Sequence, residues 1–137
     1  MAEITIRTIS SPAEAIYKEK RSKFLAFAYP VENEAEIKEK IGFLKKKYHD
    51  ARHHCYAYIL GANKATFRMN DDGEPSGTAG RPIHGQLLSK DVVNVLIVVV
   101  RYFGGVKLGT GGLRVAYKLA AKEVLENVTI IEKNVSI

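Results

Sequence analysis

Two glycine-rich stretches hold most of the residues that could do chemistry. The first, NDDGEPSGTAGRP from Asn70 to Pro82, is too polar for a strand or a helix and carries three acidic residues. Carboxylates can hold a hard cation such as Mg²⁺, or act as general acid and base. A solvated loop is the alternative, although long loops without secondary structure are often functional. The candidates here are Asp72, Gly73, Glu74, Pro75, Gly77 and Thr78, with Asp71, Asp72 and Glu74 as catalytic residues if the protein is an enzyme.

The second stretch runs from Val92 to Tyr117 and reads as strand, glycine loop and helix start. Its first part, to Val100, is β-branched and apolar, which predicts a strand buried on both faces. Thr110 is the predicted N-cap of the following helix. The start of a helix presents unpaired N–H groups and positive partial charge, which would suit an anion. A tight turn that only packs the helix on the sheet is the alternative. The candidate anion-binding or nucleic-acid-binding residues are Arg101, Tyr102, Gly104, Gly105, Lys107, Gly109, Thr110, Gly111, Gly112, Arg114 and Lys118.

Neither of the best-known phosphate-binding motifs fits this loop. Gly104 and Gly109 have the outer spacing of a P-loop, but Thr110 stands where that motif requires lysine. Arg114 stands where a dinucleotide-binding fingerprint would have its third glycine.

The predicted strand His53–Leu60 places His53 and Cys55 on one face. A zinc site needs three or four ligands, and the chain has no second cysteine. Cys55 is therefore expected to be a small core residue. The less favoured interpretation is that Cys55 is a nucleophile and His53 is its base. The sequence predicts no metal and no cofactor.

Composition favours one domain, residues 1–137, in a reducing, cytoplasmic setting. The chain has 137 residues, a formal net charge of +6 and one cysteine, so an internal disulfide is excluded. The positive charge favours an acidic partner such as nucleic acid or a phosphorylated ligand. No segment has the length of a membrane span, and the first residues lack the apolar core of a signal peptide.

Hydrophobic periodicity predicts the other elements. Asn33 and Glu36 resemble a helix N-cap with its reciprocal partner, and Ala13–Lys23 is a charged stretch with no element assigned. The helices Glu34–Tyr48 and Gly111–Glu126 are expected on the same face of the sheet. The remaining predictions are strands at Glu3–Ile9, Ser22–Tyr29 and Ala65–Met69, a short helix at Gly85–Lys90, and a last strand from Val128–Ile131 and Val135–Ile137.

The two glycine-rich stretches together resemble the signature of the IMPACT/YigZ family. The segments are DDGEPSGTAGRPI and NVLIVVVRYFGGVKLGTGGLRVAYKLA, preceded by EKRSKFLAFAYPV and RHHCYAY in the family's order. The resemblance implies an α+β fold similar to the second domain of the small-subunit ribosomal protein number five and to domain IV of elongation factor G. That fold is a two-layer sandwich, with a mixed sheet, helices on one face and a left-handed β-α-β crossover.

The resemblance also implies a function. Eukaryotic members of the family control translation under amino-acid starvation, and a nucleic-acid or ribosome-linked role is usually proposed for bacterial members. Two features depart from the family pattern. The usual ferredoxin-like C-terminal domain is expected to be absent, and Val115 stands where the family commonly has Arg or Lys.

Two functions follow as hypotheses. The first is a binding module in translation, acting through RNA, the ribosome or a regulatory protein; Arg114, Lys118 and Lys122 would form a basic stripe, and Tyr102 and Phe103 could stack on bases. The alternative is an enzyme acting on a phosphorylated small molecule or nucleotide through the two glycine-rich loops. An acidic group beside the helix start would favour the enzyme, and a uniformly basic surface would favour the binding module.

Overall fold

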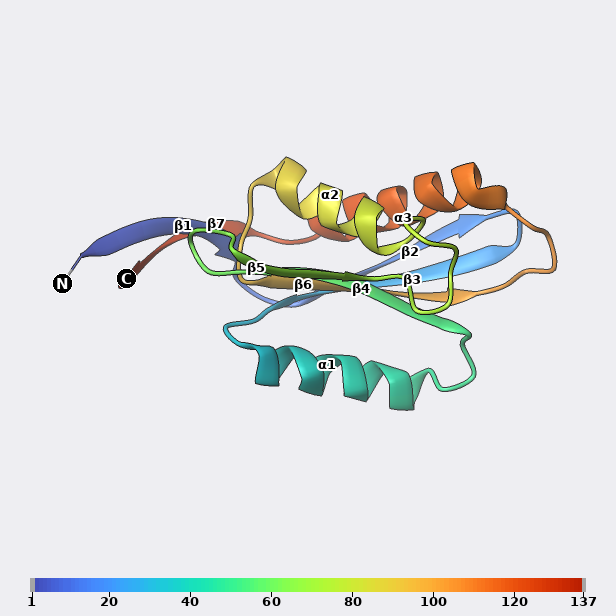
Figure 1. The fold of residues 1–137 in the computed structure, drawn as a ribbon, viewed down its shortest axis with the longest axis horizontal. Helices are drawn as coiled ribbons and strands as arrows, with labels where there is room; N and C mark the ends of the chain where they lie inside the picture. The colour runs from blue at the N-terminus through green and yellow to red at the C-terminus, as the bar shows by residue number, and fades with distance from the viewer. Residues whose placement is uncertain (1, 137) are drawn as a thin grey trace.

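The β-branched run at the centre of the sequence forms β6, the middle strand of a five-stranded sheet with the order β2-β3-β6-β4-β5. The computed structural model describes residues 2–136. Helix α1 lies on one face of this sheet, and α2 and α3 lie on the other (Figure 1). The elements are β1 (Glu3–Ile9), β2 (Ala13–Glu19), β3 (Ser22–Pro30), α1 (Glu34–Lys47), β4 (His53–Leu60), β5 (Thr66–Asn70), α2 (Gly80–Lys90), β6 (Val95–Tyr102), α3 (Gly109–Glu126) and β7 (Ile130–Ser136).

The predicted α+β class is confirmed, but the expectation that the helices share one face is wrong. Along β6, Ile97 and Val99 belong to the core under α2 and α3, whereas Leu96 and Val98 belong to a second core under α1. The chain therefore forms three layers. The reason lies in β6 itself, because a strand that is apolar at every position needs a cover on both faces.

The predicted mixed sheet is also corrected, since every hydrogen-bonded strand pair in residues 2–136 is antiparallel. Parallel strands do occur, but not as neighbours: β3 and β4 flank β6, and β5 and β6 flank β4. The crossover through α1 joins the parallel strands β3 and β4, and the crossover through α2 joins the parallel strands β5 and β6, which point the opposite way. The two crossovers also run in opposite directions across the sheet and lie on opposite faces. They are therefore of opposite hand, so one of them is left-handed, the uncommon form.

Local capping signals are confirmed for α1 but not for the other helices. The Asn33 side chain accepts a hydrogen bond from the backbone N–H of Glu36 at 2.9 Å. Helix α2 begins at Gly80 instead of Gly85, because the carboxylate of Asp71, in the loop before it, accepts the N–H of Gly80 at 2.8 Å. Helix α3 begins at Gly109, so Thr110 lies within its first turn and is not its cap.

The charged stretch without an assigned element contains an edge strand, β2. It pairs with β3 through a two-residue turn, Lys20–Arg21, in which both residues have positive φ. Outside the sheet, β1 and β7 form a separate antiparallel ribbon. Residue Ile137, predicted to end the last strand, lies outside the described residues.

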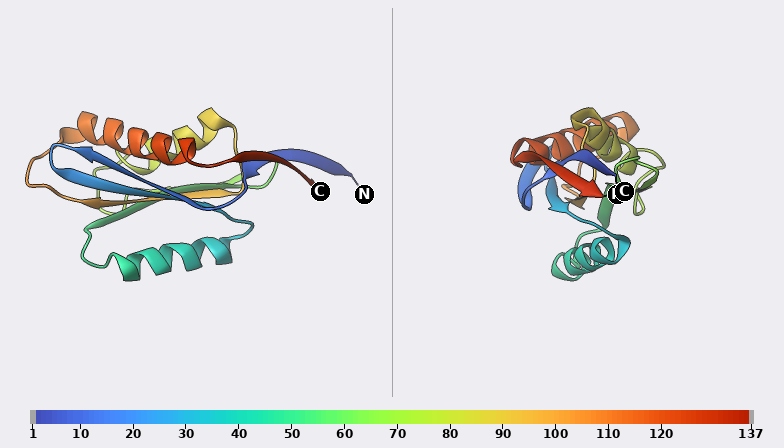
Figure 2. Two further views of the ribbon diagram at one scale, coloured as in Figure 1. Left: turned by 180° about the vertical axis from the view of Figure 1, so that it is seen from behind. Right: turned by 90° about the vertical axis from the view of Figure 1, so that its left-hand side faces the viewer.

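The two ends of the molecule differ in what they present. The described chain ends lie beside each other at the tip of the β1–β7 ribbon, whereas the opposite end gathers the β2–β3 turn and the loops before β4, α2 and α3 (Figure 2). Both glycine-rich stretches of the sequence thus reach the same end. None of the helices in residues 2–136 combines the length and apolar character needed to cross a membrane.

Gly104 is expected to be a packing residue rather than a ligand contact. A β-carbon there would lie 2.1 Å from the Arg21 carbonyl carbon, whereas one at Gly111 would meet nothing within 4 Å. We expect Gly104→Ala to lower the free energy of unfolding by about 1–3 kcal/mol through overpacking. Gly111→Ala, in a helix, should leave it unchanged or raise it by up to about 1 kcal/mol. Urea denaturation of both variants tests this, and equal stabilities would contradict the packing role.

Candidate anion-binding site

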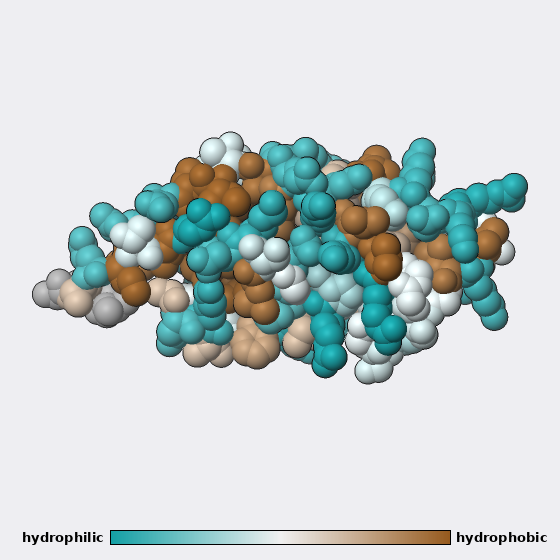
Figure 3. All heavy atoms as spheres, turned by 90° about the horizontal axis from the view of Figure 1, so that it is seen from above, coloured by the Kyte–Doolittle hydropathy of each residue, from teal (hydrophilic) through white to brown (hydrophobic). Residues whose placement is uncertain are grey.

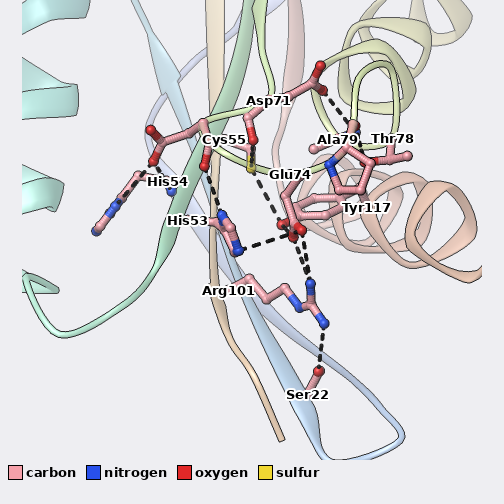
Figure 4. A network of polar contacts seen from close by, with 12 residues as sticks. Ser22, His53, His54, Cys55, Asp71, Glu74, Thr78, Ala79, Arg101 and Tyr117 are labelled. Carbon is pink, nitrogen blue, oxygen red and sulfur yellow. Dashed lines mark hydrogen bonds and ion pairs between the residues drawn. The ribbon is translucent and has the colours of Figure 1, made fainter. Parts of the chain in front are cut away.

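A buried ion pair joins the two glycine-rich stretches (Figure 4). Nη1 of Arg101, near the end of β6, donates to both carboxylate oxygens of Glu74 at 3.0 and 2.9 Å. Nη2 of the same guanidinium donates to the Ser22 hydroxyl at 3.3 Å, and the Tyr117 hydroxyl of α3 also donates to Glu74. Only 3% of the Glu74 side chain is exposed, so the carboxylate of the first loop is held by β6 and α3.

Cys55 and Tyr117 form the apolar side of this network and remain neutral. Burial raises the pKa of the Cys55 thiol and that of the Tyr117 hydroxyl well above their ordinary values. Cys55 is fully buried, with Sγ 3.2 Å from the Asp71 carbonyl oxygen. The expectation that Cys55 is a small core residue is confirmed, and a thiol held neutral in this way is a poor nucleophile.

A backbone carbonyl fixes the orientation of the His53 ring. Its Nδ1 lies 2.8 Å from the Asp72 carbonyl oxygen, which can only accept, so Nδ1 carries a proton. Its Nε2 faces Glu74, 3.6 Å from Oε1. The ring is therefore oriented with Nε2 toward the acidic member of the network.

The acidic residues of the first loop are used within the protein. Asp71 accepts the backbone N–H groups of Gly77, Ala79 and Gly80, and Asp72 accepts that of His54 at 2.7 Å. Because each carboxylate serves a different internal partner, the three do not converge. Among residues 2–136, no group of three or more His, Cys, Asp or Glu side chains is placed to hold a metal ion.

A pocket of about 380 Å³ lies where the two loops meet. Glu74 and Pro75 of the first loop line one side, and Lys107 and Thr110 of the second line another. The sequence alone left open whether the loops meet, and the structure answers it. The other lining residues are Arg52, His53, Arg101, Phe103, Leu108, Gly109 and Leu113.

The start of α3 opens into this pocket without a side-chain cap. Leu108 holds the N-cap position but its side chain makes no capping hydrogen bond. Within the described residues, the backbone N–H groups of Gly109, Thr110 and Gly111 have no protein acceptor. The first turn of a helix leaves such donors free and carries positive partial charge.

The predicted site residue Tyr102 does not reach this pocket. Its side chain packs with the core under α1, and its hydroxyl donates to Asp50.

The predicted site residues separate into three groups. Arg101, Lys107, Gly109, Thr110, Glu74 and Pro75 line the pocket. Gly77, Arg114 and Lys118 line a neighbouring groove between α2 and α3, together with Arg81, Pro82 and Val115. Gly104 packs on Arg21, Gly73 lies beside the His53 ring, the buried Thr78 side chain bonds to the Pro75 carbonyl, and Gly105, Gly111 and Gly112 shape the loop and helix start.

Sequence reasoning missed Arg52 as a site residue. It precedes β4, far from both glycine loops in the chain, and reaches the pocket only because β4 pairs with β6. Its position at the start of the RHHCYAY block was the available signal.

An α+β domain with a glycine loop at an uncapped helix start is the class that the fold and the site define. Residues 20–125 match the family described as the Impact N-terminal domain. The chain is 42% identical over 113 residues to the IMPACT family member YvyE of Bacillus subtilis, covering 82% of this chain and 52% of that protein. It is 36% identical over 126 residues to the IMPACT family member YigZ of Escherichia coli, covering 90% and 62%. The protein belongs to the IMPACT family.

Solved structures agree with this assignment. One, described as a hypothetical protein, superposes with a TM-score of 0.90 at 34% identity and covers 94% of this chain and 64% of that one. A second, the two-domain translational regulator Yih1, has a TM-score of 0.50 at 27% identity and covers 89% and 47%. The chain thus spans about half to two thirds of the length of these relatives.

The Glu74–Arg101 pair gives a stability prediction. Glu74→Gln removes one charge and leaves the Arg101 guanidinium buried without its counter-ion, which costs about 3–5 kcal/mol in comparable pairs. We expect a loss of that size in the free energy of unfolding, measured by chemical denaturation.

The matched control is Glu123→Gln on the exposed side of α3, which should change stability by less than about 0.5 kcal/mol. Replacing both members, as Glu74→Gln with Arg101→Met, should recover part of the loss, since no buried charge is then unpaired. A single variant as stable as the unsubstituted protein would contradict the role given to the pair.

Proposed function

We propose that the chain is a binding module in the regulation of translation, and that it holds the phosphate groups of RNA at the loop end of the molecule. The family assignment and the similarity to a protein described as a translational regulator support the regulatory setting. The formal net charge of +6 supports an anionic partner.

The observation that carries the proposal is the charge balance of the pocket. Glu74 is its single acidic lining residue among those described, and Arg101 neutralises it. Arg52 and Lys107 form no ion pair within residues 2–136 and face the same space as the free amides of α3. Phosphate groups are bound by this combination of basic side chains and a helix start.

The surroundings of the pocket extend the same character. The β2–β3 turn, with exposed Lys20 and Arg21, packs against Gly104 beside the pocket. Both turn residues hold positive φ, a strained conformation that often marks functional segments. On α3, Arg114, Lys118 and Lys122 are all exposed, as a basic stripe requires.

The alternative function, an enzyme acting on a phosphorylated small molecule, has one specific observation in its favour. His53 and Glu74 line the pocket, close to the helix start where a phosphate would sit. The Glu74 oxygens, however, already accept hydrogen bonds from Arg101 and Tyr117. This arrangement favours a fixed binding surface over a free general base.

Binding to RNA should be salt-dependent, and the pocket should account for part of that dependence. For single strands, log affinity falls linearly with log salt with a slope of about −0.7 per neutralised phosphate. We expect Lys107→Ala and Arg52→Ala each to weaken binding and to reduce the slope by about 0.7. Fluorescence anisotropy with a labelled single-stranded RNA between 50 and 200 mM salt, a range of about fourfold, measures this.

Lys38→Ala on the exposed side of α1 is the matched control and should leave the slope unchanged. Binding that is equally strong at low and high salt, or a slope that no pocket variant alters, would refute the proposal. A protein that is still captured after nuclease treatment of the lysate, while RNA does not bind, would move the function to a protein partner.

A further inference from the structure

We infer that the pocket takes one terminal nucleotide: a phosphate monoester at the start of α3, with the attached base against Phe103. The inference rests on the proposed function, because it uses the same pocket, and it names the ligand class. The same chemistry is offered by the phosphorylated end of a single-stranded RNA and by a free mononucleotide.

Two independent features support a phosphate at the start of α3. The amides of Gly109, Thr110 and Gly111 are free, and β-carbons built at Gly109 or Gly111 would meet nothing within 4 Å, so an anion can come close to this backbone. Separately, Nε of the pocket-lining Arg101 is buried and has no hydrogen-bond partner among the described residues. A buried donor left without an acceptor is costly, so this guanidinium has capacity for one more hydrogen bond than the protein supplies.

The positive charge of the pocket that no acidic residue cancels matches a phosphate monoester better than a phosphate diester. Because Glu74 cancels Arg101, the remaining full charges are those of Arg52 and Lys107, to which the α3 terminus adds about half a charge. A phosphate monoester carries about −1.5 to −2 at pH 7, whereas an internal RNA phosphate carries a single charge. The sum of about +2.5 therefore selects a chain end over a position within the chain.

Size and lining fit the rest of one nucleotide. A volume of about 380 Å³ lies at the lower end of small-molecule sites, which span roughly 300–1,000 Å³. Phe103 is 45% exposed, and the Arg101 guanidinium lies 5.6 Å from its ring centre. An exposed aromatic ring is a platform on which a base can stack. Leu108 and Leu113 supply apolar wall beside it.

The surface over α2 and α3 is mixed in character. Hydrophilic and apolar residues are interleaved over the α2–α3 side (Figure 3). A chain end needs only the pocket, so its recognition does not depend on this wider surface.

The test compares one short single-stranded RNA carrying a 5′-phosphate, the same RNA carrying a 3′-phosphate, and the RNA with hydroxyls at both ends. Adenosine monophosphate, adenosine and inorganic phosphate serve as competitors. We expect one terminal phosphate to tighten binding about tenfold or more, the size of a charge-assisted contact. Adenosine monophosphate should compete, and adenosine should not.

Variants locate the effect. Gly111→Val should abolish the preference for the phosphorylated end, since its side chain enters the open space at the helix start. Gly85→Val is the matched control, because Gly85 also lies in a helix with nothing within 4 Å of an added β-carbon, away from the pocket. Phe103→Leu should weaken adenosine monophosphate and leave inorganic phosphate unchanged. Thermal unfolding confirms that each variant folds.

The outcomes separate this inference from the proposed function. RNA that binds equally with or without a terminal phosphate overturns the inference and leaves the proposed function standing. Adenosine monophosphate that binds while no RNA does overturns the proposed function and supports the mononucleotide form of the inference. Binding of neither overturns both, and RNA ends that bind tenfold more tightly than the mononucleotide identify RNA as the source.

Discussion

The buried ion pair between Glu74 and Arg101 is the constraint on which the loop end of the molecule depends. It connects a polar loop to the central strand, and through Tyr117 and Ser22 it reaches α3 and β3. A charged pair with so little exposure is tolerated only when its partners satisfy it closely. That requirement sets the position of the first glycine loop against the start of α3, and so creates the pocket.

The same interaction decides the electrostatic character of the site. With the carboxylate and guanidinium cancelling each other, the pocket derives its positive charge from Arg52, Lys107 and the helix terminus. The other two acids of the loop, Asp71 and Asp72, bond to backbone N–H groups and hold the loop in shape. The acidic residues of the loop thus bond within the protein, and the basic side chains and free amides line the pocket.

The three-layer architecture provides the rigidity that this frame needs. The strand β6 is buried on both faces, between a core shared with α2 and α3 and a core shared with α1. Arg101 is the last buried residue of this strand, so the guanidinium starts from a fully packed segment. Membership of the IMPACT family, with the Impact N-terminal domain matching residues 20–125, places both loops within the shared part of the family.

Local chemistry was enough to predict β6, β4, α1 with its Asn33 cap, and the two glycine loops as the places of interest. Hydrophobic period and capping residues act within a few positions of one another, and a sequence displays them directly. Only the tertiary structure shows that α1 lies on the face opposite α3, and that Glu74 forms a buried ion pair with Arg101. Those facts depend on which strands become neighbours, because burial and long-range hydrogen bonds join residues that the chain keeps far apart.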